Sequence, residues 1–278
     1  MNRLIFIFLL LIGLIDLKAS PQSPDFLIIG EDTLSLYHLP LHSLDSLTQK
    51  RFFDNLQSDS LEFIYSLNLW RGYQAYWQII DEKLYLVGLK NNSNSETILK
   101  NTFPEHFKNG KVFAYWYNSY LSIGKDKLLK YDGVFSHNFL KSEIYEFENG
   151  KLVSQEIVDN YINLPNGISR LDRKKVTNRI FREIKKLDWK NLSDCGCDDE
   201  YWITIDEKGK ISKIEFVPTF DSEEENIEYA NEFKMCTDKL LQHLESMQFD
   251  IMKWNGQPYT EKVRIEIFYD KRLENWTE

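Results

Sequence analysis

The sequence predicts an α+β protein, in which a β-rich N-terminal domain precedes a smaller domain of helices and strands. Aromatic residues are abundant, with 15 Tyr, 18 Phe and 7 Trp, whereas alanine stands only at positions 19, 75, 114 and 230. Aromatic side chains favour pleated surfaces and alanine favours helices, so this balance indicates β-structure. Beyond residue 168, apolar residues recur at helical spacing. With 42% hydrophobic and 28% charged residues, the composition excludes a disordered chain.

The N-terminal segment 1–19 has the pattern of a secretory signal peptide. Arg3 supplies a positive charge, residues 4–15 are apolar without interruption, and Ala19 is a small residue ahead of a Ser-Pro pair. We expect cleavage after Ala19 and hence a periplasmic or secreted protein. An uncleaved anchor is the alternative, but the apolar run is shorter than the ~20 residues that span a bilayer. We therefore expect no integral membrane anchor after cleavage.

Residues 24–165 are predicted to form the β-rich domain. Short aromatic and β-branched runs are separated by turn residues, as at 81–83 (Asp-Glu-Lys) and 149–150 (Asn-Gly). An Asn-Gly pair favours a tight hairpin turn. A helix is expected near residues 43–56. The expected strands cover residues 26–29, 33–38, 73–80, 84–89, 112–117, 120–123, 127–131, 144–147 and 151–158.

A polar break at residues 166–171 is expected to be a linker, because it contains an Asn-Gly turn signal. Residues 172–270 are then expected to form a second domain. Its predicted elements are a helix, two strands joined by a tight turn, a second helix and a closing strand. They cover residues 176–187, 201–206, 211–217, 233–247 and 263–267.

Four segments of this second domain occur in a characteristic order. They are residues 202–211 (WITIDEKGKI), 236–241 (CTDKLL), 254–258 (WNGQP) and 263–268 (VRIEIF). In this order of strand, turn, strand, helix, turn and strand, the segment 198–270 resembles the C-terminal domain of the TonB energy-transducer family. The resemblance implies a small antiparallel sheet with a helix packed on one face. It also implies a location in the bacterial envelope.

The sequence also departs from that family. Residues 194–199 (DCGCDD) stand where the family has a Tyr-Pro element, and the seven prolines form no Pro-rich spacer of the kind that a transducer needs. The resemblance therefore does not imply energy transduction. We expect the second domain to bind an envelope protein partner through an exposed edge strand within residues 261–269. The docking residues predicted in that strand are Val263, Ile265 and Ile267.

Three cysteines, an odd number, lie in the second domain. An oxidising compartment favours disulfides, so Cys236 is expected to pair with either Cys195 or Cys197, and the sequence leaves open which one. The alternative is a metal- or redox-linked envelope protein that binds a soft metal ion such as Zn²⁺ or Cu⁺. Its metal ligands would be Cys195, Cys197, Asp198 and Asp199. Structural zinc sites space their cysteines by two or more residues, so the disulfide is the leading hypothesis and no cofactor is expected.

An aromatic group in the first domain is a candidate ligand cleft, because aromatic side chains often line binding sites. The same residue types are normal in a β-sheet core, which is the favoured interpretation. The surrounding segment, residues 70–86, is similar only to uncharacterised β-rich bacterial modules. The cleft candidates are Trp70, Arg71, Tyr73, Tyr76, Trp77, Trp116 and Tyr120.

Motifs for common catalytic chemistry are missing from the sequence. It contains no G-x-S-x-G nucleophile elbow, no P-loop, no G-x-G-x-x-G and no H-E-x-x-H. We therefore expect a protein that is not an enzyme and has no catalytic residues. The formal net charge of −9 argues against a nucleic-acid partner.

Overall fold

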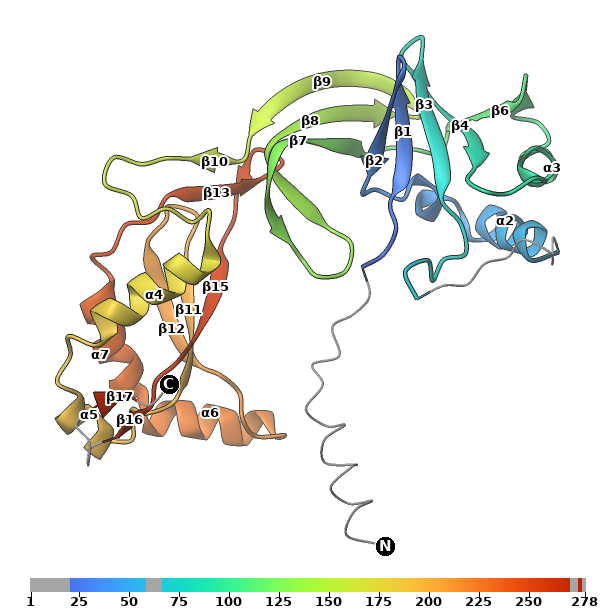
Figure 1. Cartoon of the computed structure of the whole chain (residues 1–278). Coiled ribbons are helices and arrows are strands. Elements are labelled where there is room, and N and C mark those ends of the chain that lie inside the picture. The colour runs from blue at the N-terminus through green and yellow to red at the C-terminus, as the bar shows by residue number, and fades with distance from the viewer. Residues whose placement is uncertain (1–20, 59–66, 271–274, 277–278) are drawn as a thin grey trace, which may run out of the picture. The chain divides into compact units, whose positions relative to one another are not determined.

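The computed structural model describes residues 21–58, 67–270 and 275–276 (Figure 1). Contacts divide the chain into two compact units, Met1–Val158 and Asp159–Glu278. Both units combine helices with β-sheet, which confirms the predicted α+β class. The expected signal peptide lies outside the described residues.

The first unit is built on one nine-stranded sheet. Its main path has the order β2-β1-β3-β4-β9-β8-β7, and β6 pairs with both β4 and β5 beside that path. β1 and β3 pair in parallel, whereas β1 with β2, β3 with β4 and β7 with β8 pair antiparallel. The strands are β1 (Asp25–Ile29), β2 (Asp32–Leu36), β3 (Ala75–Ile80), β4 (Lys83–Leu89), β5 (Phe107–Lys108), β6 (Lys111–Phe113), β7 (Tyr120–Tyr131), β8 (His137–Glu148) and β9 (Lys151–Asp159).

Some strand boundaries differ from the prediction. The expected strands at residues 120–123 and 127–131 form one long strand, β7, whose pairing with β8 is interrupted by register shifts. The segment expected as a strand at residues 112–117 is a strand only up to Phe113. The chain turns there, because the N–H of Tyr115 donates to the carbonyl of Phe113 (2.9 Å).

The described part of the first unit contains a short 3-10 helix and two α-helices. They are η1 (Pro40–Ser43), α2 (Ser46–Ser58) and α3 (Ser95–Thr102). α2 confirms the helix expected near residues 43–56, whereas the sequence pattern does not predict α3. Ile98 and Leu99 are the buried apolar residues of this short helix, too few to establish a helical period.

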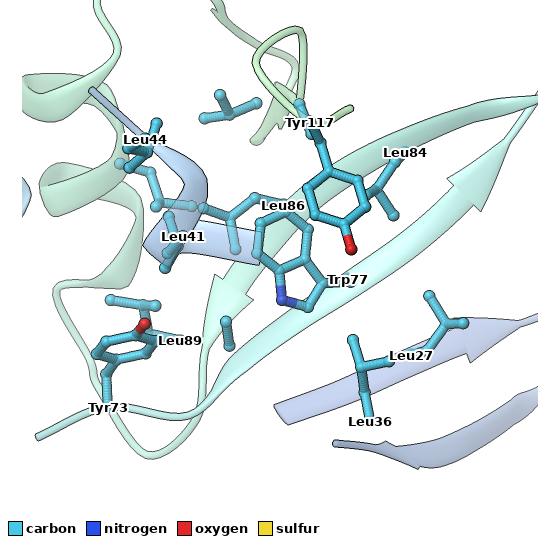
Figure 2. Close-up of a cluster of buried hydrophobic side chains, with 14 of the residues drawn as sticks. Leu27, Leu36, Leu41, Leu44, Tyr73, Trp77, Leu84, Leu86, Leu89 and Tyr117 are labelled. Atoms are coloured by element: carbon cyan, nitrogen blue, oxygen red, sulfur yellow. The ribbon is translucent and has the colours of Figure 1, made fainter. Parts of the chain in front are cut away.

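Trp77 lies in the middle of the hydrophobic core of the first unit (Figure 2). Its side chain is fully buried, and leucines from β1, β2 and β4 lie around it. Burial of one large apolar side chain stabilises a fold by about 2–3 kcal/mol. The other labelled core residues are Leu27, Leu36, Leu41, Leu44, Tyr73, Leu84, Leu86, Leu89 and Tyr117.

A buried ion pair lies beside this core. Arg71 Nη2 donates to Asp25 Oδ1 at 2.8 Å, and the two side chains are 4% and 0% exposed. The Asp25 carboxylate also accepts from the N–H of Ala75 (3.0 Å) and from Trp77 Nε1 (3.1 Å). Burial raises the pKa of the Asp25 carboxyl above its ordinary value, against the opposing effect of Arg71 and these donors. Loss of one partner would leave a buried charge unpaired, at a cost of about 3–5 kcal/mol.

The second unit contains a three-stranded antiparallel sheet with the order β12-β11-β15, so β11 is its central strand. α7 packs against β12, and α4 packs against both α7 and β15. These elements enclose one hydrophobic core. Their bounds are β11 (Glu200–Ile205), β12 (Ile211–Phe216), β15 (Glu261–Glu266), α4 (Arg173–Ile184), α5 (Trp189–Asp194), α6 (Glu223–Glu232) and α7 (Lys234–Leu244).

The expected linker at residues 166–171 lies inside the second unit. Ile168 forms a parallel bridge with Phe249, and Arg170 is only 4% exposed. The segment is therefore part of the packed unit. The remaining short strands of the unit are β10 (Tyr161–Ile162), β13 (Ile251–Trp254), β14 (Gln257–Pro258), β16 (Tyr269–Asp270) and β17 (Asn275–Trp276).

Asp250 holds this segment in place. Its buried carboxylate accepts from Tyr161 Oη (2.8 Å) and from the N–H of Leu164 (2.9 Å). A Cβ added to Gly167 would lie 2.2 Å from Asp250 Oδ1, so the chain can pass the carboxylate this closely because residue 167 is glycine. Arg170 Nη1 donates to the main-chain carbonyl of Asp250 (3.3 Å). The polar segment itself is held by main-chain hydrogen bonds of Ile168, whose N–H donates to the carbonyl of Gln248 (2.8 Å) and whose carbonyl accepts from the N–H of Asp250 (3.0 Å).

Asp250→Ala should destabilise the second unit by about 2–4 kcal/mol, because Tyr161 and Leu164 lose a buried acceptor. Asp250→Asn keeps one acceptor oxygen and should lower the free energy of unfolding of the second unit by about half as much. Hydrogen exchange followed by mass spectrometry of the full chain checks this. Peptides from the second unit should lose protection, whereas peptides from the first unit should not. Equal protection of the alanine variant and the original protein would contradict this role of Asp250.

Candidate functional site

β15 is an edge strand of the sheet in the second unit. It pairs with β11 in antiparallel register, with Ile203 opposite Val263 and Tyr201 opposite Ile265. Among the described residues, no strand pairs with β15 on its other side. The strand therefore has one side that is open to a further strand.

The side chains of the three predicted docking residues are buried. Val263, Ile265 and Ile267 are 1%, 2% and 0% exposed and belong to the hydrophobic core. Their backbone groups face β11, because the N–H of Ile267 donates to the carbonyl of Asp199 (2.9 Å) and the hydrogen-bonding direction alternates along an antiparallel pair. These residues therefore hold the edge in place and do not present it to a partner.

The backbone groups that point away from β11 belong to the intervening residues, Lys262, Arg264 and Glu266. Their side chains are exposed, and Arg264 forms ion pairs with Glu200 and Glu266. Exposed ion pairs contribute little stability, so a partner strand can rearrange these side chains at small cost. The period-two alternation of the sequence separates the residues of the strand into two sets, but only the pairing with β11 says which set directs its backbone groups outward.

A groove of about 320 Å³ lies between this edge and α4. Thr177, Asn178 and Phe181 of α4 line one side of it, and Arg264 to Glu266 of β15 line the other. The half-buried ring of Phe181 offers an apolar surface among polar groups. The groove can therefore receive side chains of a strand added to β15.

Cys197 and Cys236 form a disulfide that spans 39 residues of sequence. This confirms the expected disulfide, and Cys197 is the partner that the sequence left open. Both residues are 1% exposed, whereas Cys195 is exposed and has a free thiol. Because Cys236 lies in α7 and Cys197 lies just before β11, the bond ties the helix to the beginning of the central strand.

Asp199 makes further contacts at this point. Its carboxylate accepts from Tyr229 Oη (2.5 Å) and from the N–H of Glu200 (2.6 Å). Burial, together with the hydrogen bond to Asp199, raises the pKa of Tyr229 to about 12. The tyrosine therefore remains a neutral donor at ordinary pH. Asp199 thus connects the beginning of β11 to α6.

The described residues offer no ready metal-binding group. Among them, no three His, Cys, Asp or Glu side chains come together in the way that a metal ion requires. A sulfur in a disulfide is not a thiolate, so Cys197 is not a metal ligand while its bond to Cys236 is intact. Cys195, Asp198 and Asp199 are then what is left of the predicted ligand set. The metal- or redox-linked alternative stays a hypothesis.

The aromatic cleft candidates of the first unit do not share one surface. Arg71, Tyr73 and Trp77 are buried, Tyr76 and Trp116 are half-buried, and Trp70 and Tyr120 are exposed. A pocket of about 210 Å³ in this unit includes Tyr73 alone among the seven, beside Leu56 and Leu89. Most of the group therefore packs within the sheet and its core.

Comparison of the chain with protein-family models, with curated proteins and with solved structures finds no match. Within the described ranges, no helix is both long enough and apolar enough to cross a bilayer. The open edge of β15, the groove beside it and the disulfide are therefore the features of the second unit that bear on function.

Protein prepared under oxidising conditions should contain one reactive thiol, Cys195, whether it is native or denatured. Cys197 and Cys236 should not react, because they are bonded to each other. A thiol titration with elemental analysis checks this, and Cys195→Ser should remove the remaining signal. Three free thiols together with stoichiometric zinc or copper would instead favour the metal-linked alternative.

Proposed function

We propose that this is an exported, non-enzymatic protein of the bacterial envelope, whose second unit binds a partner protein by accepting a strand at β15. The observation that carries the proposal is the open edge of β15. There Lys262, Arg264 and Glu266 direct their backbone groups away from β11, beside the groove that Phe181 lines. An added strand would continue the sheet through main-chain hydrogen bonds, and its side chains would enter the groove.

Export is supported by two independent features. Disulfides persist in oxidising compartments and are rare in the cytosol, and Cys197 and Cys236 form one here. The apolar segment 4–15 has the composition of a signal peptide. The TonB-like order of elements fits the same compartment. A periplasmic or secreted location is therefore part of the proposal.

The partner is proposed to be a different protein. A second copy is the alternative occupant, because two copies of β15 paired about Arg264 would place Lys262 opposite Glu266 twice and the two arginines opposite each other only once. Identification of the retained protein therefore distinguishes a foreign strand from a second copy.

The first unit is proposed to bind a ligand or partner of its own. Its pocket beside Tyr73 combines the apolar side chains of Leu56 and Leu89 with the polar side chains of Gln74 and Asn91. A few polar groups in a partly apolar pocket are what orient a small ligand.

Arg264→Pro should abolish partner binding at β15. Proline removes the outward N–H, and an edge strand tolerates it at such a position. The full mature chain is immobilised and exposed to an envelope extract, and the retained proteins are identified by mass spectrometry. Arg264→Ala is the matched control, because it loses the charge but keeps the N–H. It should retain the same proteins as the original chain.

Two results would contradict this docking edge. One is retention of the same proteins by the proline variant, provided that its circular dichroism and thermal unfolding match those of the alanine variant. The other comes from amide exchange. The N–H groups of Lys262, Arg264 and Glu266 should exchange rapidly in the free protein and slowly with the retained partner. Unchanged exchange in its presence would rule out strand addition at β15.

A further inference from the structure

We propose that a second surface of this unit, the groove between β12 and α6, binds an extended, cationic segment of a partner protein. This groove lies at the opposite edge of the sheet from β15. The proposal therefore does not rest on the docking edge described above. Binding at the groove and binding at β15 can each be contradicted without affecting the other.

The groove has a volume of about 440 Å³. Ile214 and Phe216 of β12 line one side, Ile227 and Ala230 of α6 line the other, and Thr237 of α7 closes it. Ile227 is 56% exposed, although it belongs to the apolar lining. Apolar side chains that line a concave surface are typical of a binding site.

The backbone of β12 offers hydrogen-bonding groups to this groove. The N–H of Val217 donates to the carbonyl of Glu200 (2.9 Å), so the groups of Val217 and Glu215 face β11. In an antiparallel pair, the backbone groups of successive residues point alternately toward and away from the partner strand. The backbone groups of Ile214 and Phe216 therefore point away from β11. No described strand pairs with β12 on that side. An extended segment can therefore add to β12 and place alternate side chains in the groove.

One wall of the groove is held by the side chain of Asn226. Its Oδ1 accepts from the N–H groups of Thr219 and Phe220, at 3.0 Å and 3.1 Å. Its Nδ2 donates to the carbonyls of Phe220 and Ser222, at 2.7 Å and 2.8 Å. These four bonds fix the loop between β12 and α6. The groove is thus formed before a partner arrives, which lowers the entropy cost of binding.

α6 is attached to the beginning of β11. Tyr229 donates to Asp199 (2.5 Å) and its ring packs against Phe216 and Phe220. A Cβ added to Gly196 would lie 2.7 Å from Phe233, so the segment that contains the disulfide passes close to the C-terminal end of α6. The groove therefore keeps its shape through contacts with the Cys-Gly-Cys-Asp-Asp segment.

The charge beside the groove selects the partner. Residues 221–232 (DSEEENIEYANE) contain six carboxylates and no lysine or arginine. None of the six forms an ion pair with a described basic side chain, whereas Glu215, on the β12 side, is paired with Lys213 and Lys262. Unpaired charge of one sign attracts the opposite sign and speeds its association. A segment with lysine or arginine between its apolar residues fits this combination.

The test measures the binding of a fluorescent peptide to the full mature chain. The peptide alternates lysine and valine, and both of its ends are blocked so that they carry no charge. Fluorescence anisotropy should show saturable binding that salt weakens, because the attraction involves exposed charges. The same peptide with glutamate for lysine should not bind. A version N-methylated on the residues that would face β12 should also not bind, since it cannot donate to a strand edge. Equal binding of either control peptide would overturn the proposal.

Variants of the chain test which residues form the binding site for this peptide. Ile227→Asn should weaken binding about ten-fold or more, because it removes an exposed apolar contact. Leu171→Asn is the matched control, since Leu171 is 39% exposed in the same unit and does not line the groove. Replacement of Glu223, Glu224 and Glu225 by glutamine should also weaken binding about ten-fold and reduce its dependence on salt. Arg264→Pro should leave peptide binding unchanged.

Three results would overturn the assignment. They are the absence of saturable binding, equal affinity of the Ile227→Asn and Leu171→Asn variants, and an affinity that the three glutamines do not lower. Sedimentation velocity tests whether a second copy of this chain occupies the groove instead. Self-association that Ile227→Asn abolishes would show that the groove binds a second copy of this chain. That outcome would also exclude the cationic partner proposed here.

Discussion

The attachment of β11 at its N-terminal end is the constraint on which the second unit depends. The disulfide between Cys197 and Cys236 ties the chain just before β11 to α7. Asp199 adds two contacts at the same point, because its carbonyl accepts from Ile267 and its carboxylate accepts from Tyr229. Since β11 is the central strand, β12 and β15 are both held in the sheet by their bonds to it. An anchored β11 therefore positions both proposed docking edges.

The energies involved make this anchor important for binding as well as for stability. The disulfide closes a loop of 39 residues, and in the chain-entropy description such a closure stabilises a fold by about 2–4 kcal/mol. This is a large share of the free energy of unfolding of a domain, which is roughly 5–15 kcal/mol. The core side chains of β11, Tyr201, Ile203 and Ile205, are fully buried and resist displacement of the strand. A sheet held in this way presents edges of defined geometry. A partner then loses less entropy on binding than it would with a mobile edge.

The sequence predicts those parts of the fold that follow from local alternation. Ile203 and Ile205 mark a strand because they alternate with the polar residues Thr204 and Asp206. The expected hairpin and closing strand are present as β11, β12 and β15. The segment around Arg170 could not be predicted in the same way. Its partners Asp250 and Glu261 are 80 and 91 residues away, and a polar Asn-Gly stretch is locally indistinguishable from a linker. The outward direction of the β15 backbone likewise depends on its register with β11, which no local pattern contains.

Open strand edges invite association, so the charges beside each edge decide what can bind there. At β15, the positive charges of Lys262 and Arg264 are already balanced, because Glu215 and Glu200 pair with them. Beside β12, the carboxylates of residues 221–232 form no ion pair with a basic side chain among the described residues. A second copy of the chain that offered its β15 to this groove would have to give up its own ion pairs to neutralise them. A segment that carries unpaired lysine or arginine has no such cost, and this difference favours a foreign partner at the groove over self-assembly.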